Sequence, residues 1–132
     1  MSGAERRSAP ARPVYLDLPR IRLPVPCIVS ILHRVSGALL FLAGIPLLLA
    51  GVAASLASPE SFAQLRGAFA HPLAKLALLG FAWAYIHHFC AGIRFLLLDV
   101  HRGIELATAR RTSVVVLVVS LALTAAVGAR LW

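Results

Sequence analysis

The chain has 132 residues, 60% of them hydrophobic, and a formal net charge of +8 from 13 basic and 5 acidic residues. A soluble domain is closer to half apolar, whereas here the apolar residues form three long runs, which is typical of a membrane protein. The arginines cluster beside these runs, so a membrane surface explains them better than a nucleic acid does, and we expect no nucleic-acid partner. Cys27 and Cys90 have no metal-ligand spacing and are expected to be free thiols.

In chain order, the first predicted element is a cytoplasmic N-terminal segment, residues 1–26. Its second half contains Pro13, Pro19, Pro24 and Pro26. Such a density of prolines excludes a long regular helix. The remainder, 27–132, is predicted to be a transmembrane domain with helices at about 27–57, 72–99 and 112–130. Each is long enough to cross roughly 30 Å of hydrocarbon.

The connections between these helices also have sequence signals. Pro46 lies inside the first helix and is expected to bend it, which membrane helices tolerate. Ser58 follows the apolar run and is typical of the N-cap of a short interfacial helix, and Pro72 suits the first turn of the second long helix. These signals predict an all-α membrane protein with three transmembrane helices.

Basic residues indicate the orientation of the helices. Those on the N-terminal side and in the second loop are Arg6, Arg7, Arg12, Arg20, Arg22, Arg34, Arg102, Arg110 and Arg111. The opposite side has fewer, namely Arg66, Lys75 and Arg130. Because cytoplasmic loops are enriched in basic residues, we expect a multi-pass membrane protein with the N-terminus and the second loop in the cytoplasm and the C-terminus outside.

Small residues indicate which helix faces contact protein. On the first helix Ser30, Gly37, Gly44, Gly51 and Ser58 recur every seven residues. Seven residues are about two helical turns, so these positions share a face that allows close packing. On the second helix, small residues stand four positions before and after His88. They predict a shallow groove with an imidazole at its middle.

His88 is the main candidate for function. It lies about 11 residues, or roughly 16 Å along a helix, from Asp99, and an ionisable side chain at that depth indicates function by default. Imidazole is a good ligand for haem iron, and Ala84 and Gly92 would leave room for a porphyrin. The spacing alone leaves open a histidine bonded to another helix. His87 points about 100° away, which favours an interhelix role for it.

A second cluster of candidates lies near the start of the first helix. Ser30 and Arg34 are four residues apart and share a face, with His33 beside them. A hydroxyl and a guanidinium together can bind a quinone carbonyl or a haem propionate. An interfacial arginine that extends toward lipid phosphate is the alternative. Arg94, near the end of the second helix, could also reach a propionate.

A b haem with two histidine ligands needs a second imidazole at a matching depth. The third helix contains none, and His33 is expected closer to the membrane surface than His88. We therefore expect the second ligand to come from another chain, so that the three helices form part of a heteromeric bundle.

Two motifs resemble the cytochrome b556 subunit of bacterial succinate dehydrogenase. The first comprises RPVYLDL at 12–18 and SILHRVSG at 30–37; the second is HFCAGIR at 88–94, followed by Asp99. The motifs occur in the same order as in that family, and the resemblance covers most of the chain from Arg12 onward. One position departs from it, because the second motif commonly continues with histidine where this chain has Phe95. The side chain of Phe95 has no N–H to donate to a propionate, as a histidine at that position would.

The resemblance implies a function. His88 would be the axial ligand of a haem b shared with a second small membrane anchor subunit, which supplies the other axial histidine. Ser30 and Arg34 would line the quinone site, and His33 and Arg34 would lie near the haem propionates. An iron–sulfur subunit and a flavoprotein subunit would complete the complex. Succinate oxidation would occur in a partner subunit, with electrons passing to ubiquinone.

Other functions are compatible with parts of the sequence. The anchor subunit of a fumarate reductase has a similar architecture and runs electrons the other way. A haem-free structural membrane anchor would explain the small-residue faces but would leave His88 without a partner. A small transporter or channel would need more polar residues along a path than the third helix offers.

Overall fold

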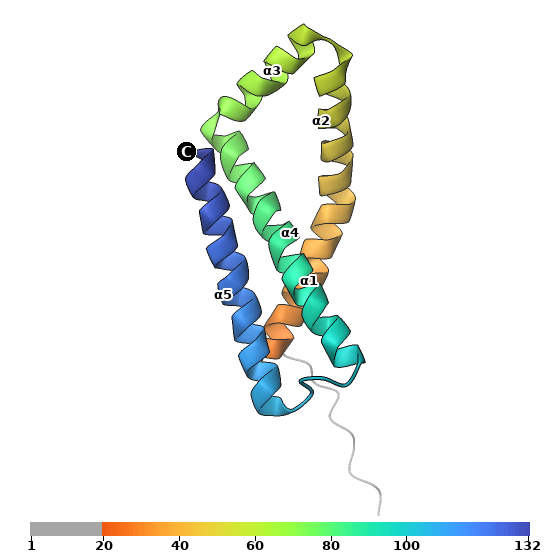
Figure 1. Ribbon diagram of the computed structural model, residues 1–132, viewed down its shortest axis with the longest axis vertical. Helices are drawn as coiled ribbons and strands as arrows, with labels where there is room; N and C mark the ends of the chain where they lie inside the picture. The colour runs from red at the N-terminus through yellow and green to blue at the C-terminus, as the bar shows by residue number, and fades with distance from the viewer. Residues whose placement is uncertain (1–19) are drawn as a thin grey trace, which may run out of the picture.

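The computed structural model describes residues 20–132, and this part of the chain contains helices and no strand (Figure 1). The elements are α1 (Val25–Leu39), the π-helical segment η1 (Leu40–Gly44), α2 (Ile45–Ala57), α3 (Pro59–Ala70), α4 (Pro72–Asp99) and α5 (Leu106–Leu131). Three continuous stretches, Val25–Ala57, Pro72–Asp99 and Leu106–Leu131, are long and apolar enough to cross a membrane. The predicted all-α fold with three transmembrane helices is confirmed, while most of the expected N-terminal segment lies outside the described residues.

The helices are arranged around α4. Figure 1 shows α4 beside α5 along most of its length, with α1 crossing α4 near the end where α5 begins. Beyond that crossing, α2 diverges from α4 and makes no contact with it, and α3 spans the distance back to the start of α4. The close packing, and therefore any site built between helices, lies in the half of the molecule where α1 meets α4.

Large apolar side chains lie on the outside of this group of helices. Leu56 is 80% exposed and Phe41 70% exposed, whereas the buried positions are mostly small, as at Ala84, Ala91 and Ser120. In water this distribution would be strongly unfavourable. In a lipid environment apolar surface needs no burial, and small residues at the seams allow helices to approach closely. The burial pattern therefore fits a membrane-embedded protein.

The bend expected at Pro46 takes the form of a π-helical turn. Proline has no N–H and its ring clashes with the carbonyl four residues earlier, here that of Leu42. The five residues of η1 precede it, and the N–H of Ile45 bonds the carbonyl of Leu40, five residues back. The wider turn accommodates the proline without ending the helix, so α1, η1 and α2 form one continuous span.

The predicted cap at Ser58 is present and begins α3. Its hydroxyl accepts a hydrogen bond from the N–H of Ser61 at 3.1 Å, and Pro59 occupies the first helical position. A side-chain hydrogen bond from Ser58 and the backbone N–H of Glu60 lower the pKa of the Glu60 carboxyl. An acid in the first turn is also favoured by the helix dipole.

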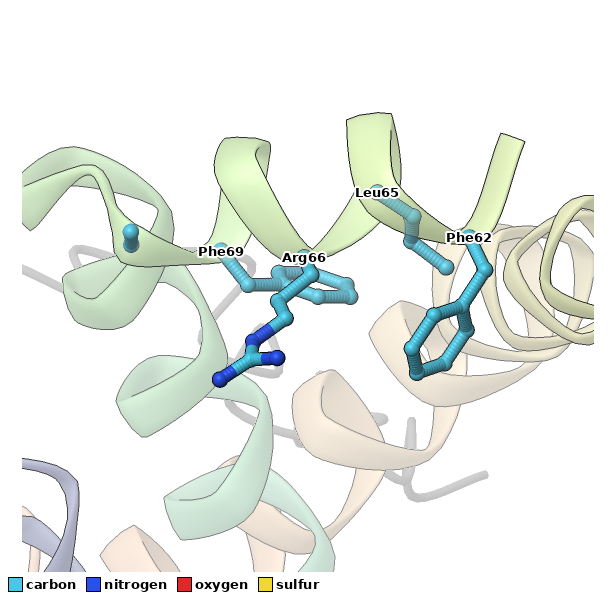
Figure 2. Close-up of a pocket in the computed structure, with 5 residues that line it drawn as sticks. Phe62, Leu65, Arg66 and Phe69 are labelled. Atoms are coloured by element: carbon cyan, nitrogen blue, oxygen red, sulfur yellow. The ribbon is translucent and has the colours of Figure 1, made fainter. Parts of the chain in front are cut away.

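One face of α3 points toward the space between α2 and α4. Figure 2 shows Phe62, Leu65, Arg66 and Phe69 extending from this face, and they line an open hollow of about 420 Å³. The spacing of these residues is that of a single helical face.

The connection between α4 and α5 is short and ordered by backbone hydrogen bonds. The N–H of Arg102 bonds the carbonyl of Leu97, and the N–H of His101 bonds that of Leu98, both at 2.9 Å. This is a Schellman motif, which needs a left-handed residue after the helix; His101 has that conformation, with φ of 59°. α5 then begins at Leu106 rather than at Thr112, because its first turns carry charged residues outside the apolar run.

The small-residue face predicted on the first span contacts protein over only part of its length. A Cβ added at Gly37 would lie 2.7 Å from Cε1 of His88, and one at Gly44 would lie 3.7 Å from the ring of Phe81. A Cβ at Gly51 would have no atom within 4 Å. The close-packing face therefore ends where α2 leaves α4.

We predict that Gly37→Ala lowers the free energy of unfolding by about 1–3 kcal/mol, because the added methyl group must displace the His88 ring or α1. Gly51→Ala is the matched control, since it fills open space and removes a mid-helix glycine, which stabilises by about 0.5–1 kcal/mol. Thermal unfolding of both variants in one detergent checks this. Equal midpoints would contradict the close approach at Gly37.

Candidate functional site

His88 lies on the face of α4 that meets α1, and its ring is partly buried. Its Nδ1 is 3.0 Å from the backbone carbonyl oxygen of His33 and 3.3 Å from the hydroxyl of Ser36. The Ser36 hydroxyl donates a hydrogen bond to that same carbonyl, at 3.0 Å. A carbonyl can only accept, so Nδ1 carries the proton and Nε2 keeps its lone pair. This is the tautomer in which Nε2 of a histidine binds a metal.

The His88 ring packs against the backbone of α1 at Gly37. Any side chain there would collide with the ring, since even a Cβ would lie 2.7 Å from Cε1. The small neighbours expected from α4 itself behave differently. Ala84 is fully buried, and the space beside Gly92 holds His33, whose Nε2 would lie 3.8 Å from a Cβ at that position. The shallow groove expected around His88 is thus partly filled by α1.

His33 stacks on His88. The ring centroids are 4.1 Å apart and the ring planes differ by 10°, while Phe95 packs on His33 in a tilted arrangement at 5.0 Å. The expectation that His33 lies at a different depth from His88 is therefore wrong, because the crossing of α1 and α4 brings the two rings side by side. Stacked rings at this separation leave no room for a porphyrin between them, so His33 and His88 cannot bind one haem iron from opposite faces in this arrangement.

Ser30 and Arg34 occupy one exposed side of α1, a turn apart. Ser30 is half-buried and Arg34 is exposed, and neither side chain forms a hydrogen bond or ion pair with the residues that the structure describes. Both lie next to the side of α1 that contacts α4, on the helix that also carries His33. Their donors are available to a ligand or to a partner subunit.

Two further ionisable residues of α4, His87 and Arg94, face α5. His87 is fully buried, with Nδ1 3.4 Å from the hydroxyl of Ser120 and its ring stacked on Trp83 at 5.3 Å. Arg94 is 6% exposed, and its Nε donates to the hydroxyl of Thr112 at 3.1 Å. The interhelix role predicted for His87 matches this placement. Arg94 is directed toward α5 and away from His88, which does not fit the propionate contact considered for it.

Sequence reasoning missed Ser36 and Gly37 as neighbours of His88. A signal was present, because both follow His33 within one turn and therefore lie on adjoining faces of the same helix. It also missed the hydroxyl face of α5, where Ser113, Ser120 and Thr124 are buried against the rest of the unit. Each of these hydroxyls donates to a carbonyl of its own helix, which satisfies it inside the membrane.

Comparison with known proteins identifies the family. The model of the succinate dehydrogenase/fumarate reductase transmembrane subunit family matches residues 8–127. The chain is 36% identical over 122 residues to the succinate dehydrogenase cytochrome b556 subunit of Coxiella burnetii (strain RSA 493 / Nine Mile phase I), covering 92% of this chain and 97% of that protein. It is 35% identical over 102 residues to the subunit of the same name from Paracoccus denitrificans, covering 77% and 78% respectively. The resemblance seen in the sequence is therefore confirmed, and this chain belongs to the succinate dehydrogenase/fumarate reductase transmembrane subunit family.

Proposed function

We propose that this chain is the haem b-binding membrane anchor subunit of a succinate dehydrogenase, and that it contributes to the quinone site and to electron transfer from succinate to ubiquinone. The observation that carries the proposal is the hydrogen bond from Nδ1 of His88 to the carbonyl of His33. It holds an imidazole within a membrane span with its Nε2 lone pair uncommitted. Relatives named as cytochrome b556 subunits support the same role.

The residues around His88 fit a haem. The Nδ1–H bond to a backbone carbonyl orients the ring and raises its basicity, as is usual for metal-bound histidines. Gly37 lets the ring pack against α1, and His33, which stacks on His88, would be a donor for a propionate. A haem bound there would act as a one-electron carrier. The other small anchor subunit would supply the second histidine that holds the haem.

Ser30 and Arg34 are proposed to bind the quinone head group. Arg34 presents a guanidinium whose donors are unshared within the described chain, and it can polarise a quinone carbonyl and stabilise negative charge on that oxygen. Ser30, one turn away, donates a hydrogen bond to the same or the other carbonyl. Arg34 and His33 would also donate hydrogen bonds to a haem propionate, so both proposed sites would share this end of α1.

The proposed role implies partner subunits. Succinate oxidation takes place in a flavoprotein subunit, and an iron–sulfur subunit passes the electrons to the anchor on the cytoplasmic side. The excess of arginines at the N-terminal side and in the α4–α5 connection supports a cytoplasmic location for that face. The chain itself provides the bacterial inner-membrane span, with its C-terminus on the periplasmic side.

The anchor subunit of a fumarate reductase is the second candidate, because the matching family model includes both enzymes. The two differ in the direction of electron flow between quinone and the dicarboxylate. Rates measured in both directions with the same quinone separate them.

We predict that His88→Ala, purified with its partner subunits, loses the b-type haem absorption, because no other described imidazole of α4 faces the same side. His87→Gln is the matched control: it removes the adjacent imidazole, which faces α5, and should keep the spectrum. An absorption spectrum and a haem-to-protein ratio measure both. An unchanged haem content in His88→Ala would reject the ligand assignment and leave a haem-free structural anchor.

We predict that Arg34→Ala lowers the rate of quinone reduction roughly 100-fold, the usual effect of removing one charge-stabilising donor. Succinate oxidation with an artificial acceptor that bypasses the membrane subunits should persist. Arg66→Ala, an exposed arginine on α3 at the other end of the span, is the control and should leave both rates unchanged. Equal loss of both activities in Arg34→Ala would indicate failed assembly instead of a quinone role.

A further inference from the structure

The seam between α4 and α5 forms a second site, separate from His88. A groove of about 430 Å³ opens along it, with an apolar wall that includes Ile93 and Leu97 of α4 and Val115 and Val119 of α5. At 100° per residue, Leu97 lies roughly opposite His88 around α4. A ligand in this groove is therefore on the other side of α4 from any haem at His88.

Two arginines line this otherwise apolar groove. Arg94 is 94% buried, as only 6% of it is exposed; its Nε bonds Thr112 at 3.1 Å and its Nη2 bonds the carbonyl of Ala109 at 3.4 Å. Its Nη1 has no hydrogen-bond partner among the described residues. Arg102, in the connection after α4, is the second cation, and the residues that line the groove include no aspartate or glutamate.

A buried cation without a counter-ion is unfavourable. Arg94 is five residues before the end of α4, which is about 7.5 Å along the helix, a depth suited to lipid head groups. The valines of α5 extend the apolar wall from Thr112 to Val119, about 10 Å further into the membrane. Cations at one end and a long apolar wall at the other complement an amphiphile with a negative head.

We propose that this groove binds one anionic phospholipid, with its phosphate between Arg94 and Arg102 and an acyl chain along Val115 and Val119. The phosphodiester supplies the missing negative charge. It also accepts hydrogen bonds from the free N–H groups of Arg94, since a guanidinium matches phosphate geometry. A free phosphate would leave the apolar wall uncovered. Covering that wall is what favours a lipid over the inorganic ion.

The test uses the intact complex, stripped of lipid in a neutral detergent. It is then placed in bilayers of phosphatidylcholine alone or with a minor fraction of phosphatidylglycerol, and native mass spectrometry counts the phospholipid that remains bound. The wild type should retain phosphatidylglycerol in preference to phosphatidylcholine. Arg102→Gln should lower that retention about five-fold, the factor for one cation near an anionic head group. Val119→Trp, which fills the wall, should also lower it.

Arg110→Gln is the matched control, because it removes one exposed arginine at the same end of α5 that does not line the groove. It should retain the lipid, and the haem spectrum of Arg102→Gln should remain that of the assembled complex. Equal retention of the two lipids by the wild type would overturn the proposal. So would an equal loss in Arg110→Gln, complete displacement of the lipid by inorganic phosphate, or a carboxylate of a partner subunit paired with Arg94.

Discussion

The hydrogen bond between Nδ1 of His88 and the backbone carbonyl of His33 determines what the rest of the molecule can do. It joins α1 to α4, and it fixes which nitrogen of the imidazole carries the proton. Its acceptor belongs to the main chain, so it depends on the position of α1 and not on the identity of a side chain. Gly37 allows that position, because the ring approaches the helix backbone more closely than any side chain would permit.

Small residues also allow close packing where α4 meets α5. Where α4 meets α5, the buried residues include Ala84, Ala91, Ser113 and Ser120. The two serine hydroxyls donate hydrogen bonds to backbone carbonyls of their own helix. The backbones therefore come close without leaving these hydroxyls unsatisfied, which a lipid environment would penalise heavily, although Nε1 of Trp83 and Nε2 of His87 are buried without a hydrogen-bond partner among the described residues. Against this background the two larger polar groups of the seam, His87 and Arg94, are exceptions that tie α4 to α5 through side-chain hydroxyls of α5.

The sequence predicted the elements better than it predicted their contacts. Apolar runs and prolines were sufficient for three spans, the bend at Pro46 and the cap at Ser58, since these depend on local chemistry. The start of α5 was placed too late, because charges at Arg110 and Arg111 end an apolar run without ending a helix. The contact of His33 with His88 was not predictable, because it depends on the angle at which α1 crosses α4, which no periodicity records.

The π-helical turn η1 determines which way α2 faces about the axis of the first span. A π turn holds more residues than an α turn, so it rotates everything that follows about the helix axis relative to an uninterrupted α-helix. Five residues in a π turn rotate the chain about as far as four residues in an α-helix, so removing one residue between Leu40 and Gly44 would restore regular winding and leave α2 near its present azimuth. Winding all five residues as a regular α-helix would instead turn α2 by about 100°. The hollow beneath α3 would then face a different direction, while the contacts of α1 with α4 would be unaltered. The π turn thus specifies the azimuth of one half of the subunit independently of the other.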